Sequence, residues 1–147
     1  MHTIGIDPGP DSYAWARYDG ADIVAWGECA VDTLPDTPLH GLAAVGIEAV
    51  MPYGPRVPFG QSTRRTCECV GAIGAMFRFA TGREPERVGR KRIAADLAGS
   101  ARAGDKGINA VIGRLCPAFA VKHRGLNGHH RAAAAVAVWL WNRFGKL

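Results

Sequence analysis

Hydrophobic and polar residues alternate along the first thirty positions of the chain. Ile4 and Ile6 alternate with Gly5 and Asp7, which is the two-residue period of a β-strand. Two further runs rich in aromatic and β-branched residues follow, separated by the turn residues 19–22. We therefore predict an antiparallel meander of three strands over 3–9, 12–18 and 23–30.

The next apolar run differs, because it is almost continuous. Residues 43–50 have the pattern of a buried parallel strand. Before them, residues 32–41 contain two prolines and no helical period, so we predict a linker there. Ten extended residues span at most ~33–36 Å. That length is just enough to carry the fourth strand to the far side of the first.

The second half of the chain is mainly helical in its periodicity. Val70, Ile73 and Phe77 fall on one stripe of a helix predicted over 61–80. Gly71 and Gly74 within it indicate close approach of another helix, either inside the fold or across a dimer interface. The remaining predictions are a mobile loop over 51–60, a short strand over 86–89, a short helix over 93–98, a loop over 99–104, a helix over 105–115 capped by Asp105, and a final helix over 129–143.

Composition narrows the choice of partner. The chain has 147 residues and is expected to form a single domain over 1–147. Its net charge of +5 favours a polyanion, with nucleic acid first, although the same balance occurs in proteins that bind none. No signal peptide or membrane-spanning run is evident. The four cysteines complete no zinc set, and we interpret them as reduced thiols of a cytosolic protein.

Two carboxylates end two of the predicted strands. Asp7 precedes Pro8-Gly9, and by itself it is either a turn residue or a ligand. Glu48 ends the fourth strand in a similar way, before a loop rich in proline and glycine. If these strands are parallel neighbours, the two ends lie about 4.8 Å apart. Carboxylates so close repel unless a cation lies between them, and Mg²⁺ or Mn²⁺ fits such oxygen ligands.

The final helix is expected to supply further ligands from its first turn. His129 and Ala132 are three residues apart and share one face. His129 can ligate a metal or handle a proton, whereas Ala132 can do neither.

Several segments together resemble the RuvC family of Holliday-junction resolvases. The resemblance covers nearly the whole chain and rests on motifs in the same order. They are Ile4-Gly5-Ile6-Asp7-Pro8-Gly9, Gly46-Ile47-Glu48-Ala49-Val50, Gly60-Gln61-Ser62, Gly99-Ser100 with Asp105-Lys106, and His129-His130-Arg131-Ala132 before an Ala-rich run.

This resemblance implies an α/β, RNase H-like fold with a five-stranded mixed sheet, three strands antiparallel and two parallel, flanked by helices. It implies an Mg²⁺-dependent endonuclease, with Mn²⁺ as a substitute, that cuts four-way DNA junctions symmetrically as a homodimer in the cytoplasm. Asp7, Glu48 and His129 would be the metal ligands and, with position 132, the catalytic set.

The chain departs from the family pattern in two places. The linker over 32–41 is shorter than the usual helical crossover, which indicates a compact member of viral or phage type. Ala132 stands where the family has a fourth acidic residue. We therefore expect an inactivated nuclease, with a junction binder that does not cut as the alternative.

The DNA contacts expected from the sequence are basic and aromatic. Lys106, at a helix start, is implied by the family to contact phosphate, or it is a solvated surface lysine. Met51 matches the position that inserts at the junction centre, and Tyr53 or Phe59 could replace it by stacking. The other candidates are Arg64, Arg65, Arg90 and Lys91.

Two other enzyme classes share parts of this pattern. An actin-like ATPase opens with a similar strand, but it needs a second phosphate loop and a much longer chain. A ribonuclease acting on RNA–DNA hybrids would have the same fold, and only a comparison of substrates separates it from a junction resolvase.

Overall fold

The computed structural model describes residues 1–50, 60–122 and 128–145. Five strands form one mixed sheet in the order β3-β2-β1-β4-β5. The predicted antiparallel meander is confirmed, and β4 and β5 continue the sheet in parallel on the other side of β1. The strands are β1 (His2–Pro8), β2 (Ser12–Tyr18), β3 (Ile23–Ala30), β4 (Leu42–Ala49) and β5 (Glu86–Gly89).

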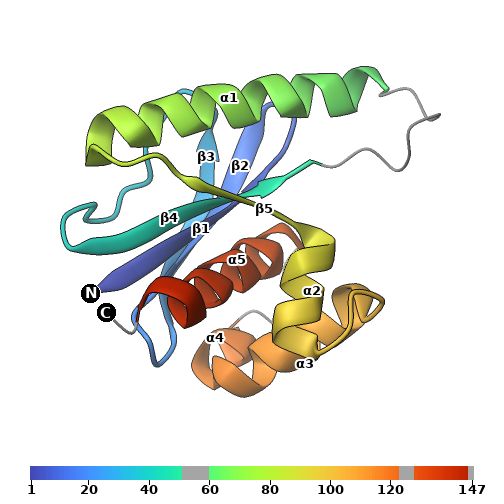
Figure 1. Cartoon of the computed structure of the whole chain (residues 1–147). Coiled ribbons are helices and arrows are strands. Elements are labelled where there is room, and N and C mark those ends of the chain that lie inside the picture. The colour runs from blue at the N-terminus through green and yellow to red at the C-terminus, as the bar shows by residue number, and fades with distance from the viewer. Residues whose placement is uncertain (51–59, 123–127, 146–147) are drawn as a thin grey trace.

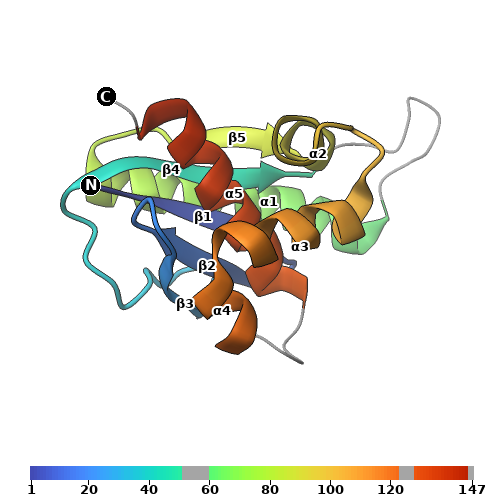
Figure 2. The ribbon, with the colours of Figure 1, turned by 90° about the horizontal axis from the view of Figure 1, so that it is seen from below.

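Helices cover both faces of the sheet (Figure 1). α1 (Gln61–Thr81) lies alone on one face, and α5 (Gly128–Phe144) crosses the opposite face. Seen from below, the three shorter helices are grouped around α5 (Figure 2). They are α2 (Arg90–Ala98), α3 (Gly104–Leu115) and α4 (Pro117–Lys122).

The alternation of β1 and β4 divides the core into two layers. Ile4, Ile6 and Ile47 are fully buried against α1. The intervening residues of both strands face α5, whose residues 132–140 are all buried. The helix predicted over 129–143 is therefore confirmed, and its burial extends beyond the side that faces the sheet because α2 and α3 also pack against it.

Glycine lets α5 lie directly on the sheet. A Cβ at Gly5 would stand 2.1 Å from the Ala133 carbonyl oxygen, and one at Gly46 would stand 2.7 Å from Leu140 Cδ1. Thr3 Oγ1 also donates a buried hydrogen bond of 2.7 Å to the Ala137 carbonyl oxygen. The position of α5 relative to β1 is thus fixed by backbone contact.

Several expectations need correction. α2 begins at Arg90, directly after β5, so the helix predicted over 93–98 starts three residues earlier and includes the basic run over 90–92. Asp105 does not cap α3: the N-cap is Ala103, with no side-chain cap bond. α4 was not expected, although Pro117 suits the first position of a helix.

The glycines of α1 do not receive another helix among the described residues. A Cβ at Gly74 would meet the sheet side chains Arg87 and Ile47 at 3.7 and 3.8 Å, and one at Gly71 would meet open space. Their use within the fold was therefore predicted wrongly, while their use between protomers stays a prediction. No helix of the described ranges is long and apolar enough to cross a membrane. The four cysteines are free thiols.

Candidate functional site

The strand ends carrying Asp7 and Glu48 meet at one edge of the sheet, as predicted. Ile6 pairs with Ile47 in parallel register, so Asp7 and Glu48 follow side by side. Both lie on the face that α5 covers, because their strand neighbours Ile6 and Ile47 point to α1. Each side chain is only 14% exposed. Two neighbouring carboxylates are therefore largely shielded from solvent.

Burial makes ionisation of both carboxyls costly. It raises the pKa of Asp7, although the hydrogen bond and charge of His129 oppose that rise. Burial also raises the pKa of Glu48, to about 7, with the nearby charge of Asp7 adding to the effect and Arg90 opposing it. A cation at this edge would relieve both penalties.

His129 approaches the pair from the first turn of α5. Its Nδ1 lies 2.7 Å from Oδ2 of Asp7, while the imidazole is 65% exposed. His129 thus lies beside Asp7, and its role as a ligand stays a prediction. The close seating of α5 on Gly5 and Gly46 explains this position, since any larger residue would lift the helix and its histidine away.

Arg90 enters the site from the other side. It is the first residue of α2, and β5 runs beside β4 and delivers it to the same edge. Its Nη1 lies 3.3 Å from Oε2 of Glu48, and its Nη2 lies 3.3 Å from Oδ1 of Asp105. The sequence predicted a DNA contact here, whereas the guanidinium is engaged by two carboxylates of the protein itself.

Two hollows open at this edge, and Asp7 and Arg90 line both. The larger, of about 690 Å³, is also bordered by Glu48, Thr63 and Lys91. The smaller has a volume of about 240 Å³, and Ala132 lines it with a side chain that is almost fully buried. The other residues of the smaller hollow are Asp105, Asn109, Gly128 and His129.

The side chains at this edge are of types that can bind a hard divalent cation. Two carboxylates and an imidazole are suitable donors, and Oε2 of Glu48 is buried without a hydrogen bond from the described residues. As placed, no three His, Cys, Asp or Glu side chains of residues 1–50, 60–122 and 128–145 surround one point. Arg90 supplies the positive charge beside Glu48 in this arrangement.

No family model and no curated protein matches the sequence. Among solved structures, Thermus thermophilus RuvC matches with a TM-score of 0.69 and 19% identity, over 99% of this chain and 97% of that one. The fold is that of RuvC. A second structure, T. thermophilus RuvC in complex with a Holliday junction substrate, matches with a TM-score of 0.71 and 18% identity, over 94% of this chain and 91% of that one.

The RuvC fold brings some of the predicted DNA contacts to the larger hollow. Lys91 lines it, and Arg64 and Arg65 follow Thr63 in the first turns of α1. Arg65 forms an exposed ion pair with Asp11. Lys106 is exposed in the first turn of α3, next to Asp105. Met51 and Tyr53, and with them Phe59, lie outside the described residues.

Asp105 and Asn109 were missed as site residues. Asp105 was taken for a helix cap because it precedes an apolar helical stripe. The two residues are four apart, which puts them on one helical face, and this spacing was the available signal. Only the packing of α3 against α2 and α5 shows that this face borders Asp7.

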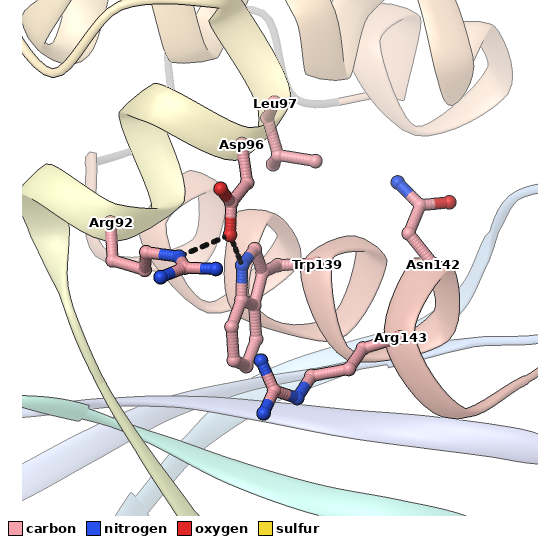
Figure 3. A pocket seen from close by; sticks show the side chains of 6 residues that line it. All are labelled: Arg92, Asp96, Leu97, Trp139, Asn142 and Arg143. Carbon is pink, nitrogen blue, oxygen red and sulfur yellow. Dashed lines mark hydrogen bonds and ion pairs between the residues drawn. The ribbon is translucent and has the colours of Figure 1, made fainter.

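A third cavity of this RuvC fold, of about 280 Å³, lies between α2 and the C-terminal half of α5 (Figure 3). Three of its side chains are joined by hydrogen bonds: Oδ2 of Asp96 accepts from Arg92 Nε at 2.6 Å and from Trp139 Nε1 at 2.8 Å. The hydrogen bonds from Arg92 and Trp139 hold the pKa of Asp96 below its ordinary value. We interpret this cluster as a clamp that fastens α2 to α5 and so fixes the position of Arg90.

Proposed function

We propose that this chain is a metal-dependent endonuclease that acts on four-way (Holliday) DNA junctions. The observation that carries the proposal is the pairing of the buried carboxylates Asp7 and Glu48 beside His129, on a RuvC fold. The positive net charge of +5 agrees with a polyanionic substrate. The match to RuvC in complex with a junction makes a branched DNA the first substrate to test.

The roles of the residues follow from their positions. Asp7 and Glu48 would hold Mg²⁺, or Mn²⁺ in its place, from adjacent strands, and His129 would ligate or take up a proton at Nε2 while Asp7 orients its ring through Nδ1. The bound cation would supply activated water and stabilisation of the leaving oxygen in phosphodiester cleavage. Lys91 and Lys106 would contact phosphates beside the hollows.

Position 132 limits this activity. The Ala132 side chain offers no donor in the smaller hollow, and we propose that cleavage by the chain is largely lost for that reason. The same observation favours a second candidate function, a protein that binds junctions without cutting them. In both cases we place the protein in the cytoplasm of a bacterial or phage-infected cell, as a compact member of the RuvC type.

One experiment separates the two functions. Junction binding and nicking by the unchanged chain are compared with those of Ala132→Asp, in Mg²⁺ and in Mn²⁺, on a labelled four-way junction, a linear duplex and an RNA–DNA hybrid. We expect Ala132→Asp to nick the junction and Ala132→Asp with Asp7→Asn to be inert. An Ala132→Asp variant that binds the junction but never cuts it would favour the binder, and preferred cutting of the hybrid would favour a ribonuclease.

We also propose that the protein is a homodimer that pairs through the outer face of α1. This face exposes small residues, Gly71, Ala72 and Ala75, next to Phe79, whose side chain is 93% exposed. Ala72, Ala75 and Phe79 are three and four positions apart, and Gly71 lies four before Ala75, so they form one stripe on the side of α1 that points away from the sheet. Two protomers joined there would carry two sites, as symmetric cleavage of a junction requires.

A further inference from the structure

Residues of α3 line the smaller hollow together with residues of α5. Asp105 and Asn109 are one helical turn apart, and both line this hollow of about 240 Å³ with Asp7 and His129. Ala132 adds only a methyl group to the same wall. Among Asp105, Asn109 and Ala132, the oxygen donors therefore come from α3, because Ala132 of α5 has none.

The carboxylate of Asp105 is directed at the site and not at its own helix. It makes no cap bond to the N-terminus of α3. Instead Oδ1 lies 3.3 Å from Nη2 of Arg90, and Nη1 of the same guanidinium lies 3.3 Å from Oε2 of Glu48. One cationic group is thus already shared between a carboxylate of β4 and a carboxylate of α3.

Electrostatics agrees with this geometry. The negative charge of Asp105 contributes to the raised pKa of Asp7 and to that of Glu48. Asp105 is therefore close enough to act on both buried carboxyls, although its own side chain is 74% exposed. An exposed carboxylate on a first helical turn is also free to change rotamer at little cost.

We propose that Asp105, with Asn109 beside it, supplies the divalent cation of this site with the oxygen ligand that position 132 lacks. The inference rests on the proposed metal-dependent function and goes beyond it, because it assigns the ligand to α3. It also assigns Arg90 a part: its guanidinium is the internal counter-charge that leaves Glu48 when the cation binds. Cation binding thus survives the alanine at 132 even where cleavage is slow.

The test uses Mn²⁺ as the probe and the full chain as the protein. Free Mn²⁺ is measured by electron paramagnetic resonance during titration of the unchanged protein, Asp105→Asn and Asp36→Asn. Asp36 is an exposed carboxylate away from both hollows, so Asp36→Asn removes the same charge elsewhere. We expect Asp105→Asn to weaken Mn²⁺ binding tenfold or more and Asp36→Asn to leave it within about twofold. Equal affinities for the two variants would overturn the proposal.

A competing explanation is that Asp105 acts only by positioning Arg90. In that case Asp105→Asn would have no effect once Arg90→Gln is present. If Asp105 is itself a ligand, Asp105→Asn should weaken Mn²⁺ binding by the same factor whether residue 90 is arginine or glutamine. In Ala132→Asp the loss caused by Asp105→Asn should shrink, because a second carboxylate then serves the same cation. An unchanged loss there would show that Asp105 does not stand in for position 132.

Failure of this inference and failure of the proposed function give different results. If Asp7→Asn abolishes Mn²⁺ binding while Asp105→Asn does not change it, the metal site stands and only the role of Asp105 is rejected. If neither Asp7→Asn nor Glu48→Gln changes Mn²⁺ binding, the metal-dependent function itself is rejected. Thermal melts of every variant show that the comparison is made between folded proteins.

Discussion

Gly5 of β1 and Ala133 of α5 are in backbone contact, with the carbonyl oxygen of Ala133 2.1 Å from the place of a Cβ on Gly5. This contact sets the height of α5 above the sheet. The same seating places His129, one turn before Ala133, against Asp7, two residues after Gly5. The geometry of the site therefore depends on Gly5, a residue that has no side chain and takes no direct part in the site.

Gly5→Ala should destabilise the fold severely. The added methyl meets backbone atoms, which cannot rotate away, so we expect a loss of about 3 kcal/mol or more in the free energy of unfolding. Gly113→Ala in α3 is the matched control, because its nearest neighbour would be 4.0 Å away. That variant should gain about 0.5–1 kcal/mol from helix propensity. Urea denaturation followed by circular dichroism measures both, and equal effects would contradict the seating argument.

Glu48→Gln should be more stable than the unchanged protein at neutral and alkaline pH without metal. The pKa of Glu48 rises from 4.5 to about 7 on folding, so the native state keeps a proton that the unfolded chain loses. Stability therefore falls as pH increases from 4.5 to about 7 and then levels off. Glutamine removes this penalty, worth up to about 3 kcal/mol above pH 7, and has little effect near pH 4. Urea melts in EDTA at several pH values test this, and a gain independent of pH would contradict it.

Phe79→Glu should separate the proposed homodimer. The change places a charge at the C-terminal end of the exposed apolar stripe on α1, where it would be buried in the interface without a partner. Val121→Glu is the control, since Val121 is 63% exposed but lies on α4. Sedimentation velocity should show monomers for Phe79→Glu and dimers for Val121→Glu and the unchanged chain. Identical oligomeric states for all three proteins would place the interface elsewhere.

Lys91→Ala and Lys106→Ala should each reduce the salt dependence of junction binding. Each lysine that neutralises a phosphate contributes about one unit to the slope of log K against log salt concentration. Arg114→Ala, at the far end of α3 from Lys106, should leave this slope unchanged. The slope is measured by filter binding between 50 and 200 mM salt. Over this range the affinity of a protein with several phosphate contacts typically falls about 10³-fold or more. A slope unaffected by both lysine changes would exclude them from the DNA interface.

The parts of the fold set by local pattern could be predicted from the sequence. Alternation identified β1, apolar and aromatic runs on either side of a turn identified β2 and β3, and an apolar run that includes Glu48 identified β4 and its carboxylate. The contacts that packing creates within the site could not be predicted, even where the residue itself was named as a candidate. Arg90 reaches Glu48 only because β5 leads into α2 without a loop, and Asp105 borders Asp7 only because α3 packs on α2 and α5. These are contacts between elements far apart in the chain, which no short window of sequence contains.

The burial of α5 has a consequence for how the protein is made. Its residues 132–140 fill one face of a sheet whose strands all lie earlier in the chain. While residues 128–144 are still inside the ribosome, that face has no cover, and His129 is not yet available to Asp7. A nascent chain of this length therefore lacks the helix that brings His129 to Asp7. The order of synthesis therefore delays assembly of the candidate site until translation has passed α5.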